Sequence, residues 1–92
     1  MIVRISGEDQ YVLPDDAAEQ LGAHEDAVVS IVESGREEDF AAAYRTLLQY
    51  VRTHGRRVPD EELESSDVIL PPGDLSFQEA GREFTGEGLI PD

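Results

Sequence analysis

The chain has 92 residues, of which 21 are Asp or Glu and seven are Arg or Lys, so its formal net charge is −14. A chain of this length forms one domain with one modest hydrophobic core. A surface field of this sign repels phosphate backbones and anionic lipid, which argues against direct binding to nucleic acid or membranes. Cysteine is absent, which excludes disulfides and thiolate metal sites.

The chain lacks the hydrophobic signals of a membrane or secreted protein. No apolar run approaches the roughly 18 residues that a membrane-spanning helix needs, and the opening MIVRISGED turns polar too early for a signal peptide. We therefore expect a cytoplasmic protein. Its acidity and its lack of lysine have three interpretations that composition leaves open: adaptation to high salt, a GC-rich genome, or a basic partner.

The first predicted element is a β-hairpin over about residues 2–13. Two short β-prone runs, IVRI and YVL, flank the glycine-containing loop SGEDQ, and this arrangement is typical of a hairpin. Because an isolated two-stranded hairpin is unstable in water, it must lie on helices or gain another strand.

Two helices are predicted next, over about residues 15–22 and 25–34. Pro14 and the acidic residues after it suit a first helical turn, where carboxylates complement the helix dipole. Gly22 and Gly35 are expected to end the two helices. The sequence leaves open whether the two form one continuous helix.

The clearest helix covers about residues 37–53. Its apolar side chains recur on one face at helical spacing; they are Phe40, Tyr44, Leu47, Leu48 and Val51. Acidic residues begin this helix and basic residues follow its end, which matches the helix dipole. We expect Gly55 to adopt the left-handed conformation that ends helices, and the basic residues around it to be balanced by the acids that follow.

A short extended segment is predicted near 67–70, followed by a helix over about 76–84. Ser76 and Glu79 have the spacing of a capping box at the start of that helix. Together these elements predict an α+β fold, mostly helical, in which an N-terminal hairpin precedes three to four helices and the extended segment.

No residue pattern predicts catalysis, a cofactor or a metal ion. His24 is followed by two acids, but ligands on a helix need to lie one turn apart, and Val28 occupies that position. We interpret His24 as an exposed residue at a helix start and His54 as a favourable charge at a helix C-terminus. No acid has the apolar surroundings that raise the pKa of a general acid.

Two apolar runs in the acidic C-terminal third, VILPP and LIP, stand out. Proline beside a β-prone run confines it to a sheet edge or outside the sheet, and an edge can pair with another chain. The candidate partner-binding residues are therefore Ile69, Leu70, Pro71, Pro72, Leu89 and Ile90. The competing interpretation places these runs in the core. We favour it for Val68 and Ile69, because a small domain needs its apolar residues.

Three stretches together resemble the PspA-associated protein family, PspAA: MIVRISGEDQY, EEDFAAAYRTLLQYVRTHG and PDEELESSDVILPPGDLSFQEAGREFTGEGLIPD. SDVILPP and GEGLIP are the most specific parts. Members of this family are encoded beside PspA, an ESCRT-III-like membrane-remodelling protein of the phage-shock response, in actinobacteria and archaea. The resemblance implies one PspAA-like domain over residues 1–92.

The resemblance also implies a function, namely a non-enzymatic adaptor without cofactors that binds and modulates a PspA-like coiled-coil partner. Such a protein would reach the inner face of the membrane only through that partner. The sequence leaves open whether the chain also forms homo-oligomers. The charge alone suggests an alternative, a small acidic transcription-associated module or nucleic-acid mimic that binds a basic protein.

Overall fold

The N-terminal hairpin forms as predicted in the computed structural model, which describes residues 1–84. Strands β1 (Ile2–Ile5) and β2 (Gln10–Val12) pair antiparallel, with Val3 opposite Tyr11. Gly7 in the connecting turn has a φ of 78°, a left-handed conformation that glycine adopts without strain. The turn therefore has the residue that its backbone requires.

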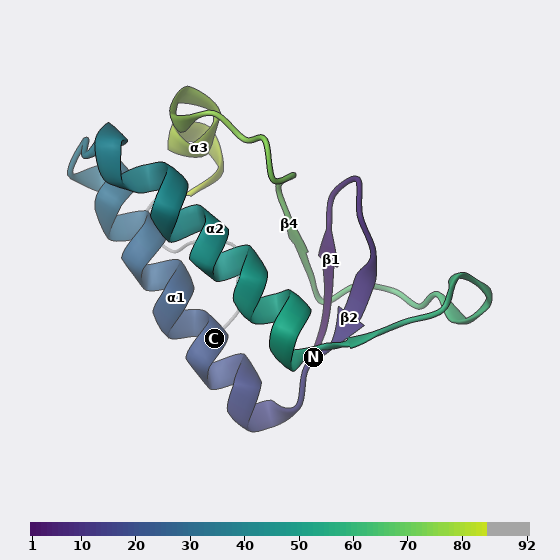
Figure 1. The fold of residues 1–92 in the computed structure, drawn as a ribbon. Helices are drawn as coiled ribbons and strands as arrows, with labels where there is room; N and C mark the ends of the chain where they lie inside the picture. Colours follow the sequence, from purple (N-terminus) through teal and green to yellow (C-terminus); the bar gives the residue numbers. More distant parts are fainter. Residues whose placement is uncertain (85–92) are drawn as a thin grey trace.

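The hairpin gains one further strand on each side, which meets its need for a larger sheet. β4 (Val68–Leu70) pairs in parallel with β1, and β3 (Arg56–Arg57) pairs antiparallel with β2. The order in the sheet is β3-β2-β1-β4, as Figure 1 shows in part. The extended segment predicted near 67–70 is thus a strand. β3 was not predicted, because two arginines after a helix resemble a helix terminus.

Helix α1 runs without interruption over Asp15–Glu33. The two shorter helices predicted over 15–22 and 25–34 are therefore one, and Gly22 does not end the first of them. A glycine inside a helix costs about 1 kcal/mol relative to alanine. Burial of the apolar stripe on both sides of Gly22 against the core offsets that cost.

Gly35 ends helix α1, as predicted. Its φ is 70°, the Arg36 N–H donates to Ile31 O at 3.0 Å, and the Gly35 N–H donates to Val32 O at 3.2 Å. These two bonds make a Schellman motif. Helix α2 follows over Glu37–His54, in agreement with the helix predicted over 37–53.

Gly55 follows α2 but differs from the prediction, because its backbone is extended, with φ −88° and ψ 152°. Glycine is needed here for a reason other than a left-handed backbone, namely close packing. A Cβ atom at this position would lie 2.8 Å from the Cβ of Tyr11 and 2.7 Å from the carbonyl oxygen of Val51. Glycine therefore lets the end of α2 touch strand β2.

The last described helix is α3 (Phe77–Glu83), and its predicted capping box is present. The Glu79 N–H donates to Ser76 Oγ at 3.1 Å, and the Ser76 N–H donates to Glu79 Oε1 at 3.0 Å. The hydrogen bond from the Ser76 backbone lowers the pKa of Glu79. This cap fixes where the chain turns from β4 into α3.

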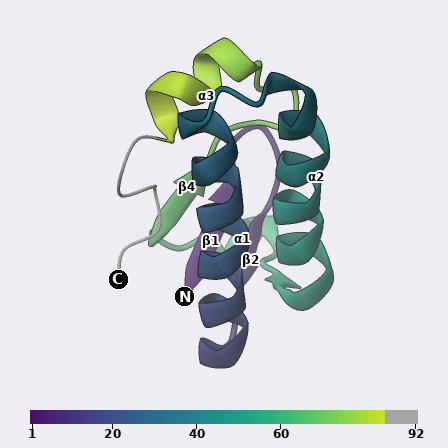
Figure 2. The same ribbon diagram turned by 90° about the vertical axis from the view of Figure 1, so that its left-hand side faces the viewer.

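The helices cover one face of the sheet, and the core lies between the two layers. Figure 2 shows α1 and α2 side by side in front of the strands, with α3 across one end. The fold is therefore α+β and mostly helical, as predicted. The largest fully buried side chains are those of Phe84, Ile5, Leu13, Leu21, Leu47, Leu70, Gln10, Val3, Val28 and Val51.

The segment between β3 and β4 is held against the face of the sheet opposite the helices. A short 3₁₀ helix, Asp60–Glu62, lies within it. Gln10 on β2 is only 1% exposed, and its side-chain amide donates to Glu64 O at 2.6 Å and to Ser66 Oγ at 2.7 Å. Its Oε1 accepts from the Glu64 N–H at 3.0 Å. The side chain of Gln10 thus bonds the backbone N–H and C=O of Glu64, which a neighbouring strand would otherwise pair.

Candidate partner-binding surface

Among residues 1–84, strand β4 forms one edge of the sheet, and its three side chains alternate between the two faces. Val68 and Leu70 are 3% and 0% exposed, whereas Ile69 is 60% exposed. The expectation that Ile69 packs in the core is therefore wrong. Successive strand residues point to opposite faces, and Val68 and Leu70 take the positions that face the helices.

The backbone of β4 also alternates. Leu70 pairs with Ile5, and its carbonyl oxygen accepts from the Ser6 N–H at 2.9 Å. Successive residues in a strand direct their N–H and C=O groups to opposite sides, so those of Ile69 face away from β1. Pro71 has no N–H and ends the ladder. Within the part of the chain that the structure describes, this edge is open, and Ile69 offers both a donor and an acceptor there.

A groove of about 420 Å³ lies beside the end of β4 and is closed on its other side by α3. Ile69 and Pro72 contribute apolar surface to it. Its charged lining consists of three acids and one base, namely Asp74, Glu79, Glu83 and Arg82. The groove thus combines an apolar edge with a net negative charge, which suits a basic and partly apolar ligand.

The six predicted partner-binding residues fall into three groups. Ile69 and Pro72 are exposed and border the groove. Leu70 and Pro71 are largely buried, although they also line the groove. Leu89 and Ile90 lie outside the described residues. Binding of a partner by this set stays a prediction.

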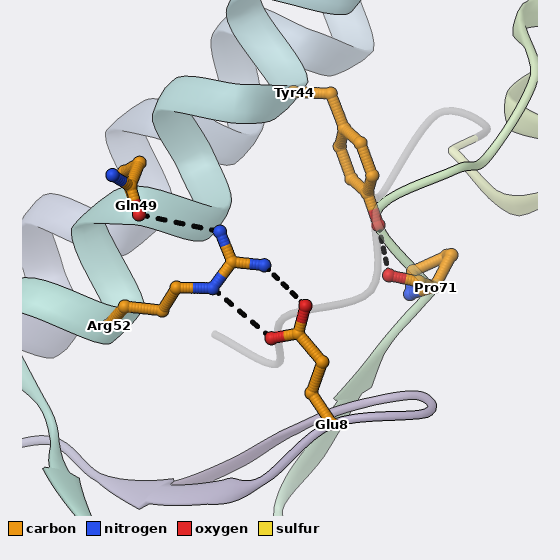
Figure 3. Close-up of polar contacts among 5 residues, drawn as sticks. All are labelled: Glu8, Tyr44, Gln49, Arg52 and Pro71. Atoms are coloured by element: carbon orange, nitrogen blue, oxygen red, sulfur yellow. Dashed lines mark hydrogen bonds and ion pairs between the residues drawn. The ribbon is translucent and has the colours of Figure 1, made fainter.

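Tyr44 fixes the turn that follows β4. Its hydroxyl donates to the carbonyl oxygen of Pro71, as Figure 3 shows. Burial, and next the negative charge of Glu8, raises the pKa of Tyr44. Its ring stacks on Phe40 with centroids 5.4 Å apart and meets Phe84 edge-on at 5.8 Å. The helical stripe in the sequence predicts that Tyr44 is buried, but not where its hydroxyl bonds.

Two of the basic residues around the end of α2, Arg52 and Arg57, pair with acids of the hairpin turn, whereas we expected the acids that follow them to balance them. Arg52 makes a two-point contact with Glu8, at 3.1 Å from Nε and 2.5 Å from Nη2 (Figure 3). Arg57 Nε lies 3.1 Å from Asp9 Oδ2, whereas Arg57 Nη2 lies 4.0 Å from Asp60 Oδ1. The hydrogen bond to Glu8 raises the pKa of Arg52.

The two histidines meet at one tyrosine on the helical layer. His24 lies in the middle of α1 rather than at a helix start, because α1 is continuous. The ring centroids of His24 and His54 lie 4.8 Å and 4.2 Å from that of Tyr50. A shallow pocket of about 310 Å³ adjoins these rings. The sequence placed both histidines on helices but did not bring them together.

Glu25 is a carboxylate that the sequence analysis did not mark. It is 3% exposed in α1. Leu21 and Val28, one turn to either side, face the core, so Glu25 lies on the buried stripe of the helix. Helical spacing from these two residues was the signal that could have found it.

Residues 1–84 contain no cluster of three or more His, Cys, Asp or Glu side chains that could hold a metal ion. Among the helices of the described part, none has the length and apolar content to cross a membrane.

Comparison with known proteins adds one finding. A family model described as PspA-Associated protein, PspAA, matches residues 1–92, which confirms the resemblance noted in the sequence. The chain matches no curated protein and no solved structure. The match includes the groove between β4 and α3 as well as the hairpin.

Proposed function

Because the chain belongs to the PspA-associated protein family, PspAA, over residues 1–92, we propose that it is a non-enzymatic adaptor of a phage-shock-type membrane stress response. It binds PspA, an ESCRT-III-like coiled-coil protein, and modulates the assembly of that protein. It acts in the cytoplasm and reaches the inner face of the membrane through PspA.

The family match carries this proposal, and the surface is consistent with it. A net charge of −14 steers the chain toward basic faces of a coiled coil. Burial of apolar surface is the main favourable contribution in most protein–protein association, and Ile69 with Pro72 offers such surface in the acidic groove.

Co-purification of the tagged chain with PspA from the same organism tests the proposal. We expect PspA to be retained at low ionic strength and less at high ionic strength, because salt screens exposed charges. Asp74→Asn should weaken retention, and Asp26→Asn, an exposed acid on α1, serves as the matched control. Failure of the two proteins to associate at any salt concentration would refute the proposal.

The charge also favours the alternative, an acidic module that mimics nucleic acid and binds a basic protein. The same purification separates the two functions. Recovery of a DNA-binding protein that DNA displaces would support the mimic, whereas recovery of PspA that DNA does not displace would support the adaptor.

A further inference from the structure

We propose that the open edge of β4 binds an extended basic segment of a partner, which adds to the sheet beside β4 as a further strand. The identity of the biological partner rests on the proposed function. The chemistry of the edge rests on β4 and the groove next to it, so the two can be tested separately.

The backbone of β4 supplies the first argument. In the described part of the chain, β4 pairs with β1 alone. The N–H and C=O groups of Ile69 face the other side. An extended peptide that lies along such an edge exchanges hydrogen bonds with it, which is the basis of recognition by strand addition.

The Ile69 side chain supplies the second argument. It is 60% exposed, although it is β-branched and apolar. Its register partner on β1 is Arg4, so Ile69 has a cross-strand neighbour on that flank. An added strand would place an apolar side chain on the other flank, where cross-strand contacts between β-branched residues stabilise a sheet.

Charge decides which segment fits. The adjoining groove has the carboxylates of Asp74, Glu79 and Glu83 against the single guanidinium of Arg82. A segment with arginine or lysine at alternate positions would complement it. A second copy of this chain fits less well, because each copy carries a net charge of −14 and would bring the same carboxylates to the contact.

The shortness of β4 sets the strength of binding. The strand has three residues and Pro71 ends its ladder, so an added strand makes few backbone hydrogen bonds. Each contributes about 0.5–1.5 kcal/mol net. Binding therefore depends strongly on the two backbone groups of Ile69, which makes this residue the one to test.

Ile69→Pro removes the edge donor and leaves the donors that face β1 in place. Proline is tolerated in an edge strand where its missing N–H would face solvent. Ile69→Val is the matched control, because it keeps the N–H and a β-branched side chain. The probe is a short synthetic peptide of alternating arginine and valine, labelled for fluorescence anisotropy. Its counterparts are the same peptide with a methylated backbone and one of alternating glutamate and valine.

We expect the arginine–valine peptide to bind the wild-type chain and Ile69→Val alike, and Ile69→Pro at least about tenfold more weakly. Both counterpart peptides should bind weakly. Saturation with the arginine–valine peptide should slow hydrogen exchange of the Ile69 amide and leave that of Leu70 unchanged. Absence of binding, equal binding to a folded Ile69→Pro, or an unchanged Ile69 amide would each overturn the proposal. Hydrogen exchange of the Ile69 amide in the wild-type chain tests the proposal even if Ile69→Pro does not fold.

Retention of PspA by the same variants separates this inference from the proposed function. PspA retained by wild type and lost from Ile69→Pro supports both. PspA retained equally by both keeps the proposed function and removes β4 as its binding site. If neither wild type nor Ile69→Pro retains PspA, the proposed function is refuted. The peptide experiment alone then tests whether the edge of β4 binds a basic strand.

A second copy of the chain, or the chain's own residues 85–92, could occupy the edge instead, and each gives a distinct experimental result. A concentration-dependent dimer that Ile69→Pro abolishes would assign the edge to a second copy and overturn the proposal. Tighter peptide binding by a variant that ends at Phe84, if circular dichroism shows it folded, would assign the edge to the chain's own residues 85–92 and overturn the proposal. Binding that is unchanged in this variant supports an edge free for a partner.

Discussion

The two edges of the sheet differ in how they meet solvent. β3 at one edge consists of two exposed arginines, and Val58-Pro59 follows it directly. β4 at the other edge consists of Val, Ile and Leu, and its middle side chain is exposed. Charged side chains and proline discourage pairing with a foreign strand. The chain therefore protects one edge by charge and keeps an apolar edge next to an acidic groove.

In the part of the chain that the structure describes, ion pairs involve β3 but not β4. In β3, Arg57 contacts Asp9 and Asp60. The pair of Arg52 and Glu8 joins α2 to the hairpin turn and lies near the turn that follows β4 (Figure 3). No residue from 68 to 84 forms an ion pair within the described part of the chain. Salt should therefore weaken the contacts of Arg57 in β3 more than the apolar packing of β4.

The largest expected effect separates the two faces of β4. Leu70→Ala should lower the free energy of unfolding by about 2–5 kcal/mol, because the side chain is fully buried. Ile69→Ala should change it by less than about 0.5 kcal/mol, as for other surface positions. Urea unfolding measures both. Equal losses from the two variants would contradict the alternation on which the open edge depends.

The next effect concerns the segment that joins the two edges. Gln10→Ala removes the side chain that bonds Glu64 and Ser66, and should lower the free energy of unfolding by about 2–3 kcal/mol because buried polar groups lose their partners. Gln49→Ala, at an exposed position of α2, is the control and should cost less than about 0.5 kcal/mol. Similar losses would show that the segment does not depend on Gln10.

Tyr44→Phe tests the contact behind β4 and should cost about 1 kcal/mol at neutral pH. The raised pKa of Tyr44 means that the folded chain keeps the phenol protonated where the unfolded chain loses its proton. Stability from this group is therefore complete below the unfolded pKa of about 10 and falls as pH rises above it. Urea unfolding from pH 8 to 11 should show a steeper loss for wild type than for Tyr44→Phe. Parallel losses would contradict the assignment.

The smallest effect concerns the ion pair that joins α2 to the hairpin turn. Arg52→Ala removes this partly exposed pair with Glu8 and should cost at most about 1 kcal/mol at low salt, and less at high salt. Arg45→Ala on the same helix is the control, because Arg45 is exposed and has no ion pair among residues 1–84. A loss from Arg52→Ala that stays constant with salt would contradict an electrostatic contribution from this pair, in contrast to the apolar packing of β4.

Local signals were sufficient to predict the hairpin, α2 and the cap of α3. Gly7, the stripe of α2, and Ser76 with Glu79 each specify their structure within a few residues. β3 was missed because Arg56 and Arg57 become a strand only by pairing with β2. Gly22 was wrongly predicted to end a helix. The apolar residues before and after it are buried on the same face, and this burial keeps α1 continuous.

The candidate surface was predictable in position but not in orientation. Pro71 and Pro72 after an apolar run indicate a sheet edge. A run of three apolar residues does not show which side chain points outward, however, and pairing with β1 settles that Ile69 does. The acidic groove forms only when α3 folds beside β4, so no spacing in the sequence reveals it.

Gly55 and Tyr44 attach one helix to the sheet at two separate points. The end of α2 touches β2 at Gly55 with no side chain between them, and even one added methyl group would push the helix and the strand apart. Tyr44, near the middle of the same helix, holds the turn after β4 through Pro71. The position of α2 on the sheet is therefore set both beside the strand that pairs with β3 and beside the end of β4.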